Sequence, residues 1–384
     1  MSSQPLLSTM RAEPIRQVPY VNLPAQFAEE REQLLPLVEH ALAAGDHVGG
    51  EAVALLEKEV ADMCGVRHVV ALNSGTDALM FALVALGISA GDEVITPPNS
   101  FIASTSAIVH VGAIPVFADV GPDQNIDPAA IERAITSRTK AIMPVHLTGR
   151  VCEMDAISDI ARRHGLRIVE DAAQSIGSTY HGRMSGALGD IGCFSLHPLK
   201  NLNAAGDGGL LATNDDGVAE RVMRLRNHGM SDRNTVVEFG FVSRLDTMQA
   251  AILRLRLSRL ADVVARRRRN AALYRDLLDR RHVFFPGERG DTVDTYHTFV
   301  VQVDHRDALK TWLADQGIGT AVHYPVPIHL QPAAARFGYR IGDFPVTEAQ
   351  AARILTLPVN QFATPEDIAY VARQVNRFFE RTRI

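Results

Sequence analysis

Residues 69–79 read Val-Val-Ala-Leu-Asn-Ser-Gly-Thr-Asp-Ala-Leu and combine an apolar run with the start of a helical pattern. The first four residues of this stretch are apolar, which is typical of a strand covered on both faces of a sheet. The next three residues break that pattern, and a helical pattern runs from Asp77 to residue 86. A short apolar strand that leads directly into a helix is half of a βαβ unit, so the stretch indicates a parallel sheet.

The same alternation continues along the chain. The other apolar runs expected to form strands are residues 93–96, 114–118, 141–145, 167–170, 191–196 and 210–213. The other helical patterns are residues 26–44, 51–64, 104–111, 128–135 and 154–164. We therefore expect an α/β fold in which helices flank a mainly parallel mixed sheet.

The length of 384 residues predicts two domains. A helical pattern without Gly or Pro runs from residue 244 to about 280, and it is expected to link a large domain (18–255) to a smaller α+β C-terminal domain (256–384). Residues 1–17 are expected to form a loose tail. The elements expected in the small domain are a strand at residues 296–303 and helices at residues 308–316, 347–354 and 365–380. Four consecutive arginines at residues 266–269 are expected to form a solvated helix face, with a phosphate or nucleic-acid patch as the alternative.

Composition excludes several classes of protein. The net charge of −5 is not that of a nucleic-acid-binding domain, and no apolar stretch approaches the roughly 20 residues that span a bilayer. The N-terminus shows no signal-peptide pattern, so a soluble cytoplasmic protein is expected. Three cysteines with no metal or redox spacing predict buried thiols and no metal site.

Chemistry that needs an amine has only four candidate residues. The lysines are Lys58, Lys140, Lys200 and Lys310, and arginine cannot supply a deprotonated amine. Lys200 follows a predicted strand and lies between a proline and a Gly-rich segment, as in a fixed, closely packed loop. The other three lysines lie within or beside predicted helices and strands and are expected at the surface.

Two further segments favour a ligand site at the edge of the sheet. The strand at 167–170 runs into Glu170 and Asp171, at the end of a strand where ligands of α/β sheets bind. An acid there can bind a metal, act as a base, pair with a cationic ring nitrogen, or simply cap the next helix. After the strand at 69–72, free N–H groups, Gly75 and the hydroxyl of Ser74 or Thr76 can bind an anion, with a simple N-cap as the alternative.

An anion site, a strand-end acid and a loop lysine together meet the needs of pyridoxal phosphate (PLP). Five motifs extend the pattern: Asn-x-Gly-Thr-x-Ala-Leu at 73–79, Pro-x-x-[Ser/Thr]-aromatic at 97–101, Glu-Asp-x-Ala-Gln at 170–174, Phe-Ser-x-x-x-x-Lys at 194–200 and His-Tyr-Pro-x-Pro-x-His at 323–329. With them the chain resembles the DegT/StrS-type nucleotide-sugar aminotransferases, within the fold-type I PLP enzymes, from about residue 18 to the C-terminus.

The resemblance implies a role for each matching residue. Lys200 would form the Schiff base with PLP, and Asp171 would hold the proton on the pyridine nitrogen. The remaining cofactor residues implied are Phe101 stacked on the ring, Gln174 near the ring hydroxyl, and Gly75, Thr76 and Ser195 at the phosphate. The residues implied at the sugar substrate are His323, Tyr324, His329 and Arg244.

The chain departs from the family at one place. Members often read Gly-Tyr-Asn-Ser-Arg where residues 240–244 read Gly-Phe-Val-Ser-Arg, and that Asn reaches the phosphate of a partner subunit. Val242 cannot make this hydrogen bond, although Ser243, Arg244 or Asn227 could replace it. The resemblance still implies a homodimer with the active site at the interface.

The resemblance implies a reaction that moves an amino group from an amino acid, glutamate on family precedent, to a nucleotide-linked keto-sugar. Gly-Asp-Gly-Gly at residues 206–209 resembles C3-specific members and favours a 3-keto-6-deoxy sugar. A 4-keto sugar or a cyclitol ketone stays open as the acceptor. A related dehydratase class carries histidine in place of the lysine, which Lys200 argues against, and a non-catalytic regulator is the remaining alternative.

Overall fold

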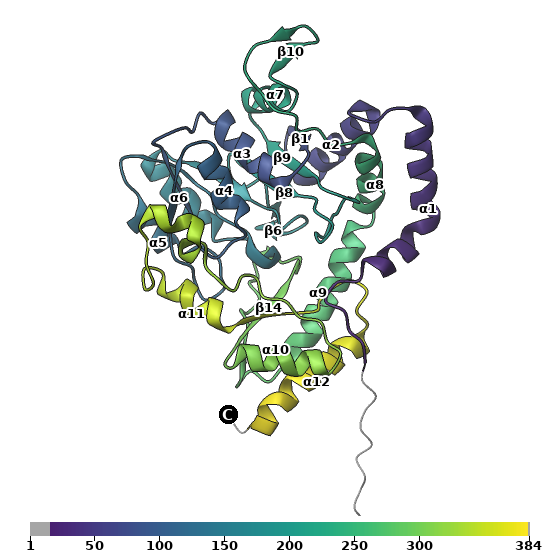
Figure 1. The fold of residues 1–384 in the computed structure, drawn as a ribbon, viewed down its shortest axis with the longest axis vertical. Coiled ribbons are helices and arrows are strands. Elements are labelled where there is room, and N and C mark those ends of the chain that lie inside the picture. The colour runs from purple at the N-terminus through teal and green to yellow at the C-terminus, as the bar shows by residue number, and fades with distance from the viewer. Residues whose placement is uncertain (1–15, 383–384) are drawn as a thin grey trace, which may run out of the picture.

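The computed structural model describes residues 16–382, and its largest element is a seven-stranded sheet (Figure 1). Its strands are β1 (His68–Leu72), β2 (Glu93–Thr96), β3 (Ile114–Phe117), β4 (Thr139–Ile142), β5 (Arg167–Asp171), β8 (Ile191–Ser195) and β9 (Gly209–Thr213). They lie in the order β1-β9-β8-β5-β4-β2-β3. β9 runs antiparallel to both of its neighbours, β1 and β8, and all other neighbouring strands of this sheet are parallel. The predicted α/β fold with a mainly parallel mixed sheet is confirmed.

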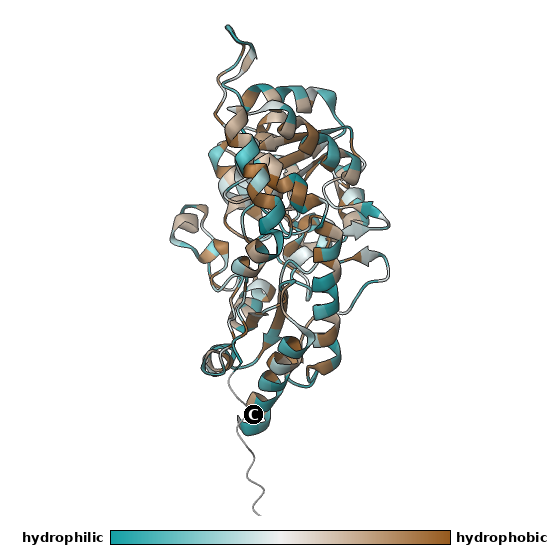
Figure 2. Ribbon diagram, turned by 90° about the vertical axis from the view of Figure 1, so that its right-hand side faces the viewer, coloured by the Kyte–Doolittle hydropathy of each residue, from teal (hydrophilic) through white to brown (hydrophobic). Residues whose placement is uncertain are grey.

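Helices cover both faces of this sheet because side chains alternate along each strand. They are α2 (Gly50–Cys64), α3 (Gly75–Ala85), α4 (Ala103–His110), α5 (Pro128–Ala134), α6 (Met154–His164), α7 (Asp216–Leu225) and α8 (Thr247–Leu257). Val70 and Leu72 pack with α3, α4 and α7 on one face. Val69 and Ala71 pack with α2 and α8 on the other. Figure 2 shows the hydrophobic strands enclosed by helices with hydrophilic outer stretches.

The C-terminal residues form a second core around a three-stranded antiparallel sheet. Its strands are β12 (Val283–Phe284), β14 (Phe299–Val303) and β15 (Ile354–Leu357). The helices of this region are α9 (Leu260–Leu277), α10 (Arg306–Asp315), α11 (Pro345–Arg353) and α12 (Pro365–Thr382), with short 3-10 turns at η2 (Ile328–Leu330) and η3 (Pro332–Phe337). In Figure 1, α9 descends from beside the large sheet to this second core.

Several short elements were not predicted from the sequence. They include β12, η2 and η3, the strands β6 (Thr179–Tyr180), β7 (Arg183–Met184), β10 (Met230–Asp232), β11 (Thr235–Val236) and β13 (Thr292–Val293), and the turn η1 (Leu147–Gly149). The helix expected at 347–354 begins two residues earlier, at Pro345, and ends one residue earlier, at Arg353, because Ile354 already pairs with Gln302 at the start of β15. Such pairing depends on distant segments that no local pattern reveals.

The long helix expected from residue 244 to about 280 is in fact two helices, α8 and α9. The break falls at Ser258, whose hydroxyl donates to the carbonyl of Leu255 at 2.7 Å and so competes with the helical backbone. The first helix, α1 (Leu23–Ala44), packs along α8, as the right side of Figure 1 shows.

The arginine run at 266–269 is not simply a solvated face. Arg267 is buried, and it donates to the carbonyls of Tyr296 and His297 at 3.2 and 3.1 Å. Arg268 donates to the carbonyl of Asp294 at 2.9 Å. Arg267 and Arg268 therefore connect α9 to residues 294–297 through hydrogen bonds.

The loose tail expected at 1–17 lies outside the described residues except for its last two. Arg16 forms an ion pair with Asp367 and donates to Thr364 at 3.2 Å. Val18 bonds to Gly317 and Gly319, each at 2.9 Å, and belongs to the C-terminal core. The division into domains at 255/256 stays a prediction. Within residues 16–382, no helix is long and apolar enough to cross a membrane.

Gly192 in β8 is a position where the fold admits no side chain. A Cβ there would lie 2.2 Å from both Cα and the carbonyl oxygen of Gly186. We expect Gly192→Ala to lower the free energy of unfolding by about 2–3 kcal/mol, because backbone atoms must move. Urea unfolding measures this loss. Gly287→Ala, where nothing lies within 4 Å, is the control and should change stability little. Equal effects of both variants would contradict the close packing at Gly192.

Candidate active site

The two acids at the end of β5 have different surroundings. Glu170 is fully buried and accepts hydrogen bonds from the backbone N–H groups of Gly186, Leu188 and Gly189 at 2.7, 2.7 and 2.6 Å. It also bonds to Nε2 of His146 at 2.8 Å. Its acceptor capacity is thus used to shape the turn at 186–189, and it serves the fold.

Asp171 has fewer hydrogen-bond partners than Glu170, which leaves its carboxylate available to a ligand. Ser104 Oγ donates to its Oδ2 at 2.7 Å, and the N–H of Ala173 donates to Oδ1 at 3.2 Å. Burial raises the pKa of Asp171, while these two hydrogen bonds and the charge of Lys200 partly oppose that rise. A buried carboxylate with so few hydrogen bonds is stabilised in its charged form by a nearby cation. Sequence reasoning took Ser104 only as the start of a helix.

Lys200 lies in the loop 196–208 between β8 and β9, and it is partly buried. Loss of solvation lowers the pKa of its amine to about 8, and the charge of Asp171 acts against the shift. The other three lysines, Lys58, Lys140 and Lys310, are exposed as expected. Lys200 is therefore the one lysine among residues 16–382 that combines partial burial with a lowered pKa.

The N-terminus of α3 approaches Ser195 closely. A Cβ on Gly75 would lie 2.8 Å from the Cβ of Ser195, so only glycine permits this approach. Ser74 is the N-cap of α3, and its hydroxyl accepts from the N–H of Asp77 at 3.1 Å. The N–H groups of Gly75 and Thr76, in the first turn, have no helical acceptor, which suits an anion.

A row of rings lines the same region. Phe101 is 54% exposed, and its ring centroid lies 5.7 Å from that of Tyr324. His323 lies between Tyr324 and Tyr20, at 5.3 and 5.9 Å. Burial and the charge of Lys200 lower the pKa of His323 to about 4, so its imidazole is neutral. Sequence reasoning missed Tyr20, which only its place on the N-terminal segment beside residue 319 reveals.

Two further basic groups join the site, and nothing in their local sequence marked them. Burial, followed by the charges of Lys200 and Arg267, lowers the pKa of His297 well below its usual value. Burial lowers the pKa of Arg267 to about 10. No carboxylate among residues 16–382 forms an ion pair with Arg267. The charges of Lys200 and Arg267 both act on His297, so positive charge gathers in this part of the site and favours anionic ligands.

Three predicted site residues do not face the Lys200 site freely. Two of them bond to other parts of the fold, and the third lies at the surface. His329 is buried, bonds to Glu348 at 3.0 Å and packs on the ring of Phe344. Gln174 Oε1 accepts from the N–H of Thr148 at 2.8 Å. Arg244 is exposed at the surface.

The surroundings of Val242 narrow the candidates that could replace the missing Asn. Val242 is 52% exposed and forms a backbone bridge with Asn227. Ser243 is fully buried, and its hydroxyl bonds to both the N–H and the side chain of Asn73 at 3.2 and 3.1 Å, so it is not free. Arg244 donates to Asn227 at 3.3 Å, and these two remain near the surface.

Comparison with known proteins agrees with this geometry. The model of the DegT/DnrJ/EryC1/StrS aminotransferase family matches residues 28–376. The chain belongs to this family. It is 43% identical to a UDP-N-acetyl-3-dehydro-alpha-D-glucosamine 3-aminotransferase from Acidithiobacillus ferrooxidans, over 94% of this chain and 97% of that protein. An aminotransferase fold and a sugar aminotransferase family are thereby confirmed.

Solved structures show the same fold. Crystalline DesV from S. venezuelae, in complex with a ketimine intermediate, matches with a TM-score of 0.93 and 41% identity, over 95% of this chain and 99% of that chain. NtdA from Bacillus subtilis with its bound cofactor PMP matches with a TM-score of 0.89 and 32% identity, over 96% and 86%. PMP is the aminated form of PLP, and the donor set described above fits this cofactor: an amine, a buried carboxylate, an open ring face and a helix N-terminus.

The two acids of β5 should respond differently to neutralisation. Glu170→Gln puts an amide against donor N–H groups, so we expect a loss of about 3 kcal/mol in unfolding free energy. Asp171→Asn removes a charge that burial already disfavours, so its loss should stay below about 1 kcal/mol. Urea unfolding of the cofactor-free protein measures both. A larger loss for Asp171→Asn would contradict these roles.

The amine of Lys200 should titrate near pH 8. Below that pH the ammonium form does not react with acylating reagents, and above it the free amine does. We expect peptide mass spectrometry of the cofactor-free protein to give a midpoint near 8 for Lys200. Exposed Lys58 is the control, with a midpoint near the ordinary lysine value of about 10.4. Coinciding midpoints would show that Lys200 is solvated.

Proposed function

We propose that this protein is a PLP-dependent aminotransferase that moves an amino group from an amino acid, glutamate, to a keto-sugar carried on a nucleotide. The observation that carries the proposal is the position of Lys200. Its amine is partly buried, has a pKa lowered to about 8, and lies close enough to Asp171 for their charges to interact. The N-terminus of α3 beside Ser195 supplies an anion site at the same sheet edge.

Bound PLP supplies an aldehyde for the amine and a ring that accepts electrons from a substrate carbon. Asp171 holds a proton on the ring nitrogen, and Ser104 orients that carboxylate through its 2.7 Å hydrogen bond. Phe101 offers an exposed ring for stacking, and the first turn of α3 binds the phosphate. The further contacts assigned to the cofactor are Thr76, Gln174 and Ser195.

Lys200 acts as the acid and base of the reaction. A pKa of about 8 leaves Nζ able to take up or release a proton near neutral pH, whereas a solvated lysine would stay charged. His323 and Tyr324 line the substrate side, and His323 is neutral there. Arg244 and His329 are kept as weaker substrate candidates, because neither contacts this group directly.

The acceptor is proposed to be a 3-keto sugar of the 6-deoxy class. The similar enzyme from Acidithiobacillus ferrooxidans is named for amination at C3, and residues 206–209 read Gly-Asp-Gly-Gly. A 4-keto sugar or a cyclitol ketone is the alternative acceptor. A non-catalytic regulator would have no need of a partly buried amine beside a buried carboxylate, which costs stability.

The partner is proposed to be a second copy of this chain. The hairpin of β10 and β11 projects from the body in Figure 1. Phe239 beside it is 99% exposed, and Val236 and Val237 are each 56% exposed. Apolar surface of this kind is typical of an interface. Arg244 donates to Asn227 at 3.3 Å, and these two residues are proposed to replace the missing Asn at the phosphate of the other subunit. A cytoplasmic location fits the three buried, unpaired thiols.

The test is spectroscopic and chemical. Protein incubated with PLP should absorb in the visible region, lose that band with glutamate and regain it with 2-ketoglutarate. Lys200→Ala should lose the band and at least about 10³-fold in turnover, because the acid and base is gone. Lys58→Ala, at an exposed lysine, is the control. A wild-type protein that stays colourless with PLP would contradict the proposal, and a panel of 3-keto and 4-keto nucleotide sugars identifies the acceptor.

A further inference from the structure

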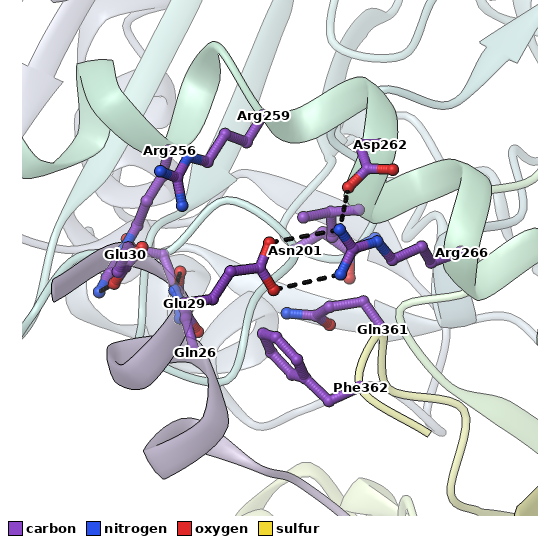
Figure 3. A pocket seen from close by; sticks show the side chains of 12 residues that line it. Gln26, Glu29, Glu30, Asn201, Arg256, Arg259, Asp262, Arg266, Gln361 and Phe362 are labelled. Carbon is purple, nitrogen blue, oxygen red and sulfur yellow. Dashed lines mark hydrogen bonds and ion pairs between the residues drawn. The ribbon is translucent and has the colours of Figure 1, made fainter. Parts of the chain in front are cut away.

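A polar hollow lies directly behind the loop that carries Lys200 (Figure 3). It is lined from α1, from α8 and α9, and from residues 361 and 362, and Asn201 and Asn203 of the loop belong to its wall. Figure 3 shows the guanidinium of Arg266 between Glu29 and Asp262, with which it pairs at 3.1 and 2.7 Å. The hollow thus marks where α1 meets the loop.

Asn203 uses its whole amide at this contact. It is 5% exposed, and its Nδ2 donates to the carbonyl of Pro198 at 2.6 Å and to Gln26 Oε1 at 3.1 Å. Its Oδ1 accepts from Gln26 Nε2 at 3.0 Å. Pro198 and Asn203 lie on opposite sides of Lys200 in the sequence, so the Asn203 side chain closes the segment that holds the lysine.

The backbone of Asn203 is fixed as well. Its carbonyl accepts from Nη1 of Arg256 at 2.8 Å. Arg256 is held in turn by Glu30 of α1, which is 2% exposed and receives two hydrogen bonds from Nε at 3.0 and 3.1 Å. A buried pair with this geometry has little freedom. Asn203 therefore joins α1 and α8 to the Lys200 loop.

Leu202 is fully buried in the core formed with α2 and α8, but few other hydrogen bonds restrain the middle of this loop. Lys200 N–H donates to the carbonyl of His197 at 2.8 Å, and Asn201 Nδ2 donates to the carbonyl of Thr295 at 3.2 Å. The N–H of Ala205 is bound by Gln249 of α8 at 2.8 Å. Without the hydrogen bond to Pro198, the Asn203 side chain would no longer hold residues 197–200.

We propose that Asn203 is a positioning residue for Lys200: by bonding Pro198 across the loop and Gln26 on α1, it holds the lysine amine in its partly buried place beside Asp171. The proposal rests on the proposed catalytic role of Lys200. It adds that the position of the amine is set from outside the site, by the N-terminal helix.

An amide is the group that this task requires. Both N–H groups of Nδ2 have an acceptor, and the oxygen has a donor. Asn203→Asp keeps the shape and the acceptor but loses both donors, which leaves the carbonyl of Pro198 without its partner. Asn203→Ala removes all three bonds. If Asn203 acted only by packing, Asn203→Asp would behave like the wild type. If Asn203 positions the loop through its hydrogen bonds, Asn203→Asp should behave like Asn203→Ala.

The experiment uses the cofactor-free full chain, so that a failure of the PLP proposal does not affect it. Hydrogen exchange of residues 197–203 and the pH midpoint of Lys200 acylation are measured by mass spectrometry. We expect Asn203→Ala and Asn203→Asp to speed exchange at Lys200 about tenfold or more, because an opened loop exposes its N–H. The acylation midpoint should move to higher pH, toward that of an exposed lysine. The titratable groups around the amine, Asp171, His297 and His323, are unchanged in every variant.

Gln33→Ala is the matched control. Gln33 is an exposed amide on the same helix, and it accepts only from Arg259, at 2.8 Å, without touching the loop. Its exchange and midpoint should match those of the wild type. Gln26→Ala breaks only the amide contact between Gln26 and Asn203, so the Lys200 acylation midpoint should rise by a smaller amount. This variant still tests the proposal if Asn203→Ala does not fold.

With PLP bound, the Asn203 variants should lose about a hundredfold in kcat with little change in the KM of the donor, since misplacement of the amine affects the chemical step. An unchanged acylation midpoint in folded Asn203→Asp, or in Gln26→Ala if neither Asn203 variant folds, would overturn the proposal. A loss of stability without faster exchange at Lys200 would also overturn it.

Discussion

The site depends on the Lys200 amine, which is partly buried and close enough to Asp171 for their charges to interact. An amine removed from water is easier to deprotonate, and its pKa of about 8 reflects that balance. A carboxylate removed from water needs a cation or a set of donors, and Asp171 has only Ser104 and the N–H of Ala173. Both groups are therefore held in an environment that disfavours their charges, and a cationic ring held by Asp171 would relieve the carboxylate.

The fold creates this arrangement by close contact between backbones. The N-terminus of α3 meets Ser195 only because residue 75 is glycine, and β8 meets the turn at residue 186 only because residue 192 is glycine. The same turn is held by Glu170, one residue before Asp171. The two neighbouring acids of β5 thus have different roles, because Glu170 shapes the edge of the sheet and Asp171 faces the site.

Much of this was predictable from the sequence, for physical reasons. The strands of the large sheet and α6 follow local patterns, because burial on two faces demands apolar runs. Lys200 stood out because lysine is rare in this chain and the residue follows a strand end. Tyr20, Arg267 and His297 could not be predicted, since they reach the site from distant segments through tertiary contacts. No local pattern marked the break between α8 and α9, and the arginine run looked solvated because Arg267 and Arg268 bond to main-chain oxygens of distant residues.

Lys200 is proposed to be the lysine that carries the cofactor, and covalent trapping distinguishes it from the other three lysines. Reduction of the PLP-loaded protein with borohydride fixes the cofactor on the amine to which it is bound. The account predicts that peptide mapping finds one pyridoxyl label, on the peptide that contains Lys200, and that competition with glutamate before reduction removes it. A label on Lys58, Lys140 or Lys310 in place of Lys200, or no label at all, would contradict the account.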